Sequence, residues 1–195
     1  MKRTKRRPEV IRQNGNTGIK VFTLLVALLC CLYLSIVTHP DYYHPSPRVA
    51  KLIDAYCNAY AVKPSLVEAV MLTESKFDEK AVSHAGAVGM MQLMPDTAEW
   101  ISGESGLPAS ALERPEQNVP LGIWYIRYLL DKYEQNKVLA LAAYNAGRGN
   151  VDEWMTERGW TTGFTNVSEI PFPETREFVK AVLEAEARMD EKQKG

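Results

Sequence analysis

The chain has 195 residues, of which 46% are hydrophobic and 24% are charged, and its formal net charge is −1 at pH 7. This length allows one domain of ordinary size with an appendage, and the composition is sufficient for a hydrophobic core. Residues 1–20 contain seven basic residues and one acidic residue, a net charge of +6, so the rest of the chain has −7. Because the net positive charge is limited to this end, we relate it to membrane topology and expect no nucleic-acid partner.

An uncharged stretch follows the basic segment. Val21 to Val37 is a run of 17 residues without a charge, which is at the lower limit for crossing a bilayer core of ~30 Å. Positive charge on its N-terminal side keeps that side in the cytoplasm. We therefore expect a basic cytoplasmic segment over 1–20 and a single transmembrane signal anchor over 21–38.

Two other interpretations of this stretch are possible. A cleaved signal peptide would need small residues before the cleavage site, but residues 35–37 are Ser-Ile-Val and no Ala-x-Ala occurs. Cys30 and Cys31 suggest a lipoprotein, but leucines precede them where small residues would be expected. We expect these cysteines to be embedded in the membrane or acylated. Residues 39–47 are rich in proline and tyrosine and are predicted to be a short linker.

Helical periodicity dominates the rest of the chain. Apolar residues at helical spacing over 49–60 predict a first amphipathic helix, and Pro64 is well placed to begin a second. Asp96 and Glu99 form a capping-box pattern for a third helix.

Four more helices are expected further along, over 121–133, over 138–146 with Gly147 ending it, over 151–155 and over 178–189. No alternating strand pattern of convincing length and no internal repeat occurs. The sequence therefore predicts an all-α domain.

Glu74 is the most informative residue. A helix through this part of the chain places Glu74 on the same face as Val67, Val70 and Met71. Burial and the negative end of the helix dipole both disfavour the ionised form, so both raise the pKa of the carboxyl toward neutrality. A general acid requires such a pKa. The alternative is a helix-terminal glutamate that reaches water or pairs with a lysine such as Lys76.

Three sequence segments accompany this glutamate. The first is Gly86-Ala87-Val88-Gly89-Met90-Met91-Gln92-Leu93-Met94-Pro95, whose glycines suit a tight turn that lets the main chain approach a ligand. The second is Ala142-Ala143-Tyr144-Asn145-Ala146-Gly147, and the third is Ile170-Pro171-Phe172 followed by Glu174-Thr175-Arg176.

Together with Glu74, these segments resemble the catalytic signature of the family 1 lytic transglycosylases, which are related to goose-type lysozyme. The resemblance covers roughly residues 48–189, and its departures are small: Met90 stands where the family usually has leucine, and residues 78–79 replace a frequent Asn-Pro. The resemblance implies a lysozyme-like helical domain with a catalytic cleft over 48–190, followed by a tail over 191–195.

The resemblance also implies the reaction. Standard glycoside hydrolysis needs two carboxylates across the scissile bond, and the nearest second candidate, Asp78, lies past the helix end where a turn residue is expected. In the family reaction the N-acetyl carbonyl of muramic acid attacks its own anomeric carbon. Glu74 would first protonate the glycosidic oxygen and then take the proton of the C6 hydroxyl, which gives a 1,6-anhydro end without consuming water.

Six further positions match residues that line the family's cleft. Ser83 resembles a serine that contacts the catalytic glutamate and the sugar, with a turn serine as its alternative. Gln92 is expected to form a hydrogen bond to the substrate, and Met94 to contact the sugar through its apolar surface.

The other three positions come from the second and third segments. Tyr144 resembles the tyrosine that orients the N-acetyl group and the glutamate, with packing in the core as its alternative. Asn145 is its neighbour in the cleft. Glu174 resembles a carboxylate on the cleft wall, which we expect to bind substrate or tune the electrostatics, or else to be an acid at a helix N-terminus.

Three functional hypotheses follow. The first is a membrane-anchored lytic transglycosylase that acts on peptidoglycan glycan strands outside the bacterial cytoplasmic membrane, with envelope-assembly machinery as a further possible partner. The others are a hydrolytic muramidase of the same fold and a non-catalytic glycan-binding scaffold. We expect no cofactor and no metal, because histidine occurs only at positions 39, 44 and 84 and no metal-binding motif is present. Cys57 is the only cysteine after the anchor, so no internal disulfide is expected there.

Overall fold

A computed structural model describes residues 22–32 and 43–192, and the chain divides into two compact units at Tyr42 and Tyr43. In the first unit, residues 22–32 form a helix with exposed apolar side chains, among them Leu24 and Leu29. Within the two described ranges, no helix has the length and apolar character needed to cross a membrane.

Several predicted segments lie outside the described residues. These are the basic segment over 1–20, both ends of the predicted anchor, the linker up to residue 42, and 193–195 of the tail. The anchor therefore stays a prediction.

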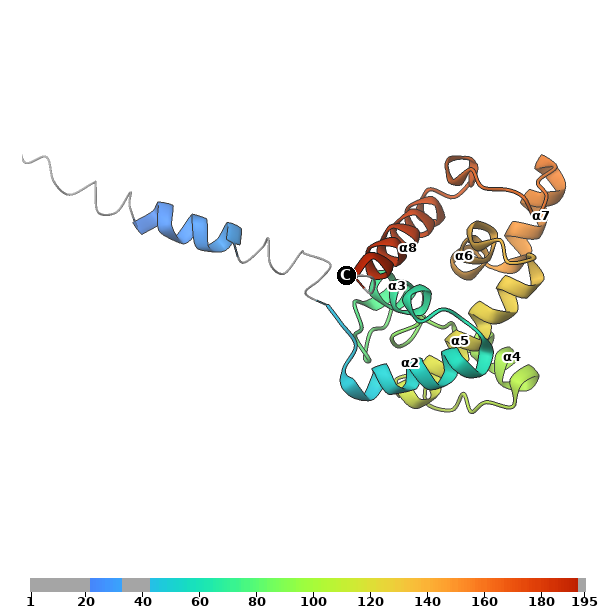
Figure 1. Cartoon of the computed structure of the whole chain (residues 1–195), viewed down its shortest axis with the longest axis horizontal. Coiled ribbons are helices and arrows are strands. Elements are labelled where there is room, and N and C mark those ends of the chain that lie inside the picture. The colour runs from blue at the N-terminus through green and yellow to red at the C-terminus, as the bar shows by residue number, and fades with distance from the viewer. Residues whose placement is uncertain (1–21, 33–42, 193–195) are drawn as a thin grey trace, which may run out of the picture. The chain divides into compact units, whose positions relative to one another are not determined.

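The second unit is a helical domain (Figure 1). Its helices are α2 (Pro47–Tyr60), α3 (Pro64–Ser75), α4 (Pro95–Ser105), α5 (Pro115–Lys132), α6 (Lys137–Ala146), α7 (Arg148–Arg158), the 3-10 helix η2 (Val167–Glu169) and α8 (Pro173–Lys192). Between residues 43 and 192 the only extended pairing consists of isolated bridges, from Val88 to Val82 and to Leu93. The prediction of an all-α domain is confirmed.

Proline sets the start of most of these helices. α2, α3, α4 and α5 each have proline in the first helical positions, where its fixed φ suits the helix and its missing N–H removes no hydrogen bond. The predicted capping box of α4 is wrong. The helix begins at Pro95, so Met94 occupies the cap without a side-chain hydrogen bond, and Asp96 falls inside the first turn. There its negative charge interacts favourably with the positive end of the helix dipole.

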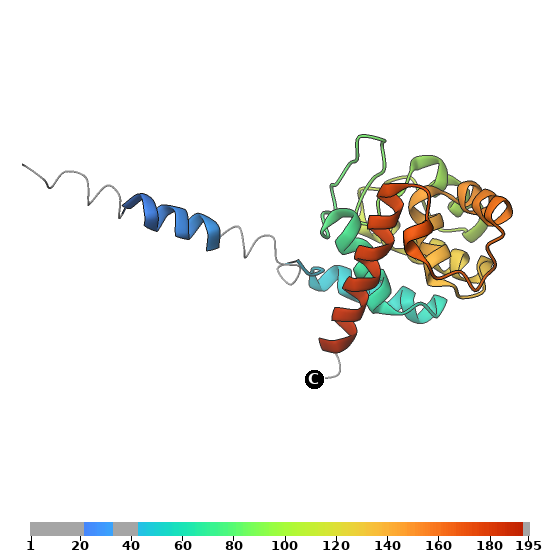
Figure 2. The same ribbon diagram turned by 90° about the horizontal axis from the view of Figure 1, so that it is seen from above.

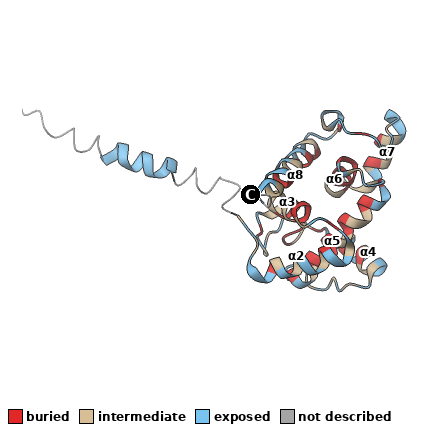
Figure 3. Cartoon of the chain, viewed as in Figure 1, coloured by how far each residue is buried: buried red, intermediate tan, exposed pale blue. Residues whose placement is uncertain are grey.

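The core lies where the helices meet, with α3 against α8, α2 against α5, and α6 against both α5 and α8. Figure 3 shows the buried surfaces of these helices turned toward one another. Val67, Val70 and Met71 of α3 are fully buried, so the predicted apolar face of this helix is confirmed. The next turn of that face carries Glu74.

A long connection without helix joins α3 to α4, and Figure 2 shows it reaching out from the helices. Gly86 and Gly89 both have positive φ, +92° and +78°, in the region that glycine adopts most easily. Their surroundings differ. A Cβ atom on Gly89 would lie 2.5 Å from Asn118 Nδ2 and 2.6 Å from the carbonyl oxygen of Leu112, whereas a Cβ on Gly86 would meet nothing within 4 Å.

We predict that Gly89→Ala destabilises the domain far more than Gly86→Ala. Both substitutions force a left-handed alanine, at a cost of about 1–2 kcal/mol. Gly89→Ala also drives an atom into main chain and a buried amide, and overpacking of this kind costs about 1–3 kcal/mol more. Urea denaturation of the two variants measures the difference, and equal losses of unfolding free energy would contradict the close approach at Gly89.

Candidate active site

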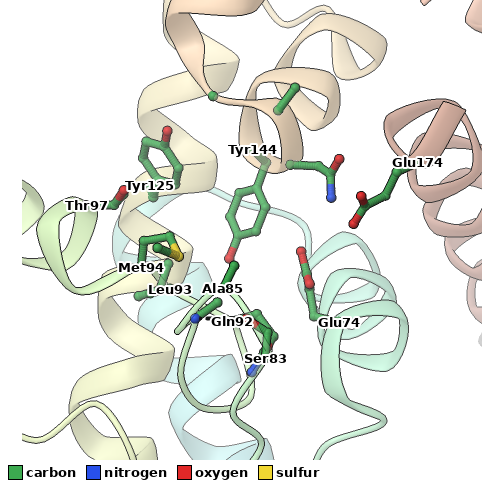
Figure 4. A pocket seen from close by; sticks show the side chains of 14 residues that line it. Glu74, Ser83, Ala85, Gln92, Leu93, Met94, Thr97, Tyr125, Tyr144 and Glu174 are labelled. Atoms are coloured by element: carbon green, nitrogen blue, oxygen red, sulfur yellow. Dashed lines mark hydrogen bonds between the residues drawn. The ribbon is translucent and has the colours of Figure 1, made fainter. Parts of the chain in front are cut away.

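A cleft of about 350 Å³ opens between the α3–α4 connection and helices α3, α4, α5, α6 and α8. It is lined by Glu74, Ser83, Ala85, Ala87, Gln92, Leu93, Met94, Thr97, Tyr125, Tyr144, Asn145, Ala146, Gly147 and Glu174. Figure 4 shows the side chains of these residues around the cleft. All seven residues predicted for the site lie in this one cleft, although they come from four separate parts of the chain.

Glu74 lies in the last turn of α3, where its side chain is partly buried. Among the described residues no donor or cation pairs with its carboxyl group, and Lys76 instead lies over the ring of Tyr43, 5.2 Å from its centroid. Burial, and secondly the charge of Glu174, raise the pKa of Glu74 to about 8. The direction agrees with the prediction from the apolar face. The carboxyl group is therefore largely protonated at neutral pH.

The glycine-containing segment over 86–95 forms one wall of the cleft. Hydrogen bonds with side chains of three helices hold its main chain at Met90 and Met91. Ser75 Oγ of α3 donates to the carbonyl oxygen of Met90 at 2.9 Å. Asn118 of α5 is 1% exposed, and its Oδ1 accepts from the amide of Met91 at 2.8 Å. The hydroxyl of Tyr144, in α6, donates to the carbonyl oxygen of Met91 at 2.7 Å. These bonds fix the position of the glycine-containing segment relative to the glutamate.

Tyr144 serves both the core and the cleft. Its ring lies 5.5 Å from that of Tyr125 and stacks at 6.3 Å on Phe178. Burial and the nearby Glu74 raise the pKa of the Tyr144 hydroxyl well above its usual value. The hydroxyl therefore stays protonated and donates to the main chain, while its oxygen can still accept a hydrogen bond from a ligand.

Ser83 and Gln92 are engaged in shaping the connection. Ser83 Oγ accepts from the amide of Ala87 at 2.9 Å, which is the turn role considered for this serine. Gln92 has a φ of +45°, and its Nε2 donates to the carbonyl oxygens of Ala81 at 3.1 Å and Gly89 at 2.8 Å. No described residue bonds to the side-chain oxygen of Gln92, so this atom is the one available to a ligand.

The remaining predicted residues form the rim. Met94 is 41% exposed, as an apolar contact with a ligand would require. Asn145 Oδ1 accepts from the hydroxyl of Thr175 at 2.7 Å, which joins α6 to α8. Glu174 is exposed in the first turn of α8. An ion pair between the half-exposed Lys137 and the buried Glu186, 2.7 Å long, anchors the same helix further along.

The sequence reasoning missed several lining residues, of which Tyr125 and Thr97 have side chains suited to ligand contact. Tyr125 belongs to the helix predicted over 121–133, and in the structure it is only 5% exposed. Helical periodicity cannot tell a core tyrosine from one at the floor of a cleft, because both lie on the same face. In the ranges 22–32 and 43–192, no three His, Cys, Asp or Glu side chains come together as a metal site.

We predict that Glu74→Gln makes the folded domain more stable at neutral and alkaline pH. A carboxyl group whose folded pKa is about 8, against 4.5 when free, destabilises the fold increasingly as pH rises between these values. The glutamine variant should therefore match the wild type below pH 4.5 and exceed it by ~3 kcal/mol at pH 7.

Denaturation across this pH range measures the difference, with Glu99→Gln, which removes an exposed carboxylate of α4, as the control. A variant less stable than the wild type at pH 8 would show that the carboxyl group of Glu74 is not destabilised by its surroundings.

The class of protein is defined by a helical domain whose cleft holds an unpaired, protonated glutamate beside a tyrosine and a rigid glycine-containing wall. Residues 51–166 match the family described as transglycosylase SLT domain. The chain belongs to this family, and the match includes every predicted site residue except Glu174, which lies beyond its end.

Curated relatives have corresponding names. The soluble lytic murein transglycosylase of Salmonella typhimurium is 35% identical over 141 residues, which cover 70% of this chain and 22% of that protein. The membrane-bound lytic murein transglycosylase C of Histophilus somni is 34% identical over 116 residues, which cover 53% of this chain and 32% of that protein. The chain thus matches about a quarter of the length of these relatives.

Solved structures give the same result. An inactive glutamate-to-glutamine mutant of lytic transglycosylase Slt from Pseudomonas aeruginosa superposes with a TM-score of 0.64 and 32% identity, covering 73% of this chain and 24% of that one. A 70-kDa soluble lytic transglycosylase in complex with bulgecin A has a TM-score of 0.68, 32% identity and the same coverage. The lysozyme-like fold expected from the resemblance is confirmed.

Proposed function

We propose that this protein is a peptidoglycan lytic transglycosylase that cleaves the β-1,4 bond between N-acetylmuramic acid and N-acetylglucosamine without water. The observation that carries the proposal is Glu74, a carboxyl group with a pKa of about 8 that faces a cleft and has no partner among the described residues. At neutral pH it holds the proton that the leaving oxygen must receive. The names of the relatives support the choice of murein as substrate.

One glutamate would serve in both steps. Glu74 donates its proton to the glycosidic oxygen while the N-acetyl carbonyl of the same muramic acid attacks the anomeric carbon. The resulting carboxylate then removes the proton of the C6 hydroxyl, which closes the 1,6-anhydro ring and restores the acid. A base with a raised pKa suits this second step, since it holds the proton more tightly than an ordinary carboxylate.

The other site residues would hold the sugar. We assign substrate contacts to the free oxygen of Gln92 and to the exposed thioether of Met94. Tyr144, whose hydroxyl is fixed by Met91, would orient the N-acetyl group beside Glu74. Ser83 and Asn145 would contact the sugar from the two sides of the cleft while they keep their turn and helix contacts.

A hydrolytic muramidase is the second candidate, and Glu174 is the observation that favours it. Hydrolysis uses a second carboxylate across the scissile bond, and Glu174 lies in the same cleft as Glu74. Asp78 does not supply this group, because its side chain accepts from the amide of Lys80 at 2.9 Å in a turn outside the cleft lining. We assign Glu174 to electrostatic tuning, since its charge helps to keep Glu74 protonated.

We predict that Glu74→Gln abolishes digestion of purified sacculi while the fold is kept. The amide is nearly isosteric but cannot donate and recover a proton, and loss of general acid catalysis alone costs ~10²–10⁴-fold in rate. Wild-type activity should fall as pH rises through about 8, because the acid form is lost.

Mass spectrometry of the wild-type products should show muramic acid ends lighter by one water than reducing ends. Reducing ends would support the muramidase. A Glu74→Gln variant that digests sacculi as well as the wild type would contradict both Glu74-dependent mechanisms, whereas a wild type that binds sacculi but releases no products would support a non-catalytic glycan-binding scaffold.

We also propose that residues 21–38 anchor the protein in the bacterial cytoplasmic membrane with its N-terminus inside, because basic residues precede an uncharged run. The exported domain would then reach the glycan from the membrane, alone or within envelope-assembly machinery. Carbonate washing of membranes should not release the full-length chain, and protease added to spheroplasts should remove the domain. A mature form that begins near residue 39 would show that the segment is a cleaved signal peptide instead.

A further inference from the structure

Arg148 lies directly beside the cleft but has no part in the chemistry described above. It is the first residue of α7 and follows Gly147, which lines the cleft. Its guanidinium carbon lies 3.9 Å from the centroid of the Trp100 ring and 5.3 Å from that of Tyr128. Its Nη1 donates to the Tyr128 hydroxyl at 2.9 Å. Stacking and this hydrogen bond together hold the charged group in one place.

The aromatic residues that hold it reach the cleft. Trp100 of α4 packs edge-on against Tyr128 at 5.0 Å and against Tyr125 at 6.2 Å. Tyr125 itself lines the cleft. The positive charge of Arg148 acts on the Tyr125 hydroxyl and partly opposes the rise in its pKa that burial causes. The guanidinium therefore lies near the end of the cleft that Tyr125 forms.

The charge of Arg148 is not balanced within the described residues. Five other described cations each form an ion pair with a carboxylate, and these are Arg48, Lys63, Arg127, Lys132 and Lys137. No described carboxylate pairs with Arg148. Asp152 lies one turn further along α7, but it accepts from the Tyr133 hydroxyl and pairs with Lys132. A guanidinium has five N–H donors, so most of those on Arg148 remain available.

The cleft is thus electrically asymmetric. Figure 4 shows Glu74 and Glu174 on one side of the cleft and Thr97 and Tyr125 on the other, and Arg148 adds a positive charge near the Tyr125 side. A neutral sugar at the acidic side and a carboxylate at the basic side would match this arrangement. In peptidoglycan the glycan is neutral along most of its length, and the peptides attached to muramic acid carry free carboxylates.

We propose that Arg148 binds a carboxylate of the peptide substituent on the glycan and so makes the enzyme selective for strands that carry charged peptides. The proposal rests on the proposed function. A planar guanidinium held by stacking is preorganised for a two-point hydrogen bond to a carboxylate, which a lysine in the same place could not form. Arg148 would be a specificity residue and would take no part in proton transfer.

The test compares two substrates that differ only in charge. Disaccharide-peptide oligomers are prepared from peptidoglycan, and in one portion the peptide carboxylates are converted to methylamides. The wild type should prefer the carboxylate form by about 10–100-fold in kcat/KM, since a hydrogen bond between charged groups is worth this much. Arg148→Gln should reduce the ratio to about one, and Arg148→Lys, which keeps the charge, should give an intermediate ratio.

Arg158→Gln is the matched control. Arg158 ends the same helix, and its guanidinium lies over the ring of Trp160 at 5.9 Å, away from the lining of the cleft. This variant should keep the wild-type ratio.

Three results would overturn the proposal, and the first and third of them do not depend on the folding of the glutamine variant. The first is a wild type with no preference between the substrates. The second is an Arg148→Gln variant that loses kcat/KM equally on both, since a purely structural role in the aromatic cluster would give this result. The third is an Arg148→Lys ratio equal to that of the wild type. If the wild type converts neither substrate, the proposed function itself fails, whereas turnover without selectivity rejects only the role of Arg148.

Discussion

The geometry of the cleft depends on how two consecutive peptide groups, those of Met90 and Met91, are held. Side chains from three helices bond to this main chain: Ser75, Asn118 and Tyr144. A buried peptide group that loses its hydrogen bond costs about 1–3 kcal/mol, so each of these side chains is required where it stands. Two of the three are also neighbours of Glu74, because Ser75 follows it in the chain and Tyr144 shares its cleft. The same few bonds therefore set both the position of the wall and its distance from the Glu74 carboxyl group.

Glu74 is a carboxyl group that the core accommodates at the expense of stability. The helix face that buries Val67, Val70 and Met71 continues into a carboxyl group, and burial keeps that group protonated. An apolar side chain there would suit the fold better, and this local conflict between fold and sequence is typical of a functional site. The surrounding core compensates, since the helix that carries Glu74 packs against α8.

The helices and the members of the site could be predicted from the sequence, but the partners of the side chains could not. Pro64 and Gly147 act locally, so the helix limits that they set were predicted correctly. The cap assigned to Asp96 failed because the helix begins at Pro95, two residues earlier than that cap requires. The pKa of Glu74 was expected to rise toward neutrality because of burial and the helix dipole, and burial together with the charge of Glu174, on a helix 100 residues later, raises it to about 8. The proximity of Glu174 is a property of the tertiary structure, and no local pattern contains it.

Cys57 has a consequence for the folding of the domain. It is fully buried on α2, beside the core, and it is the only thiol among residues 43–192. No cross-link between parts of the domain is then needed to complete its structure, so the domain can reach its native state in an oxidising or a reducing compartment alike. The same thiol can also report on motion. Because burial raises its pKa to about 12, it is inert while α2 is in place and becomes reactive only when that helix detaches. Its rate of alkylation therefore measures how often the domain opens at α2, and no engineered cysteine is needed for the measurement.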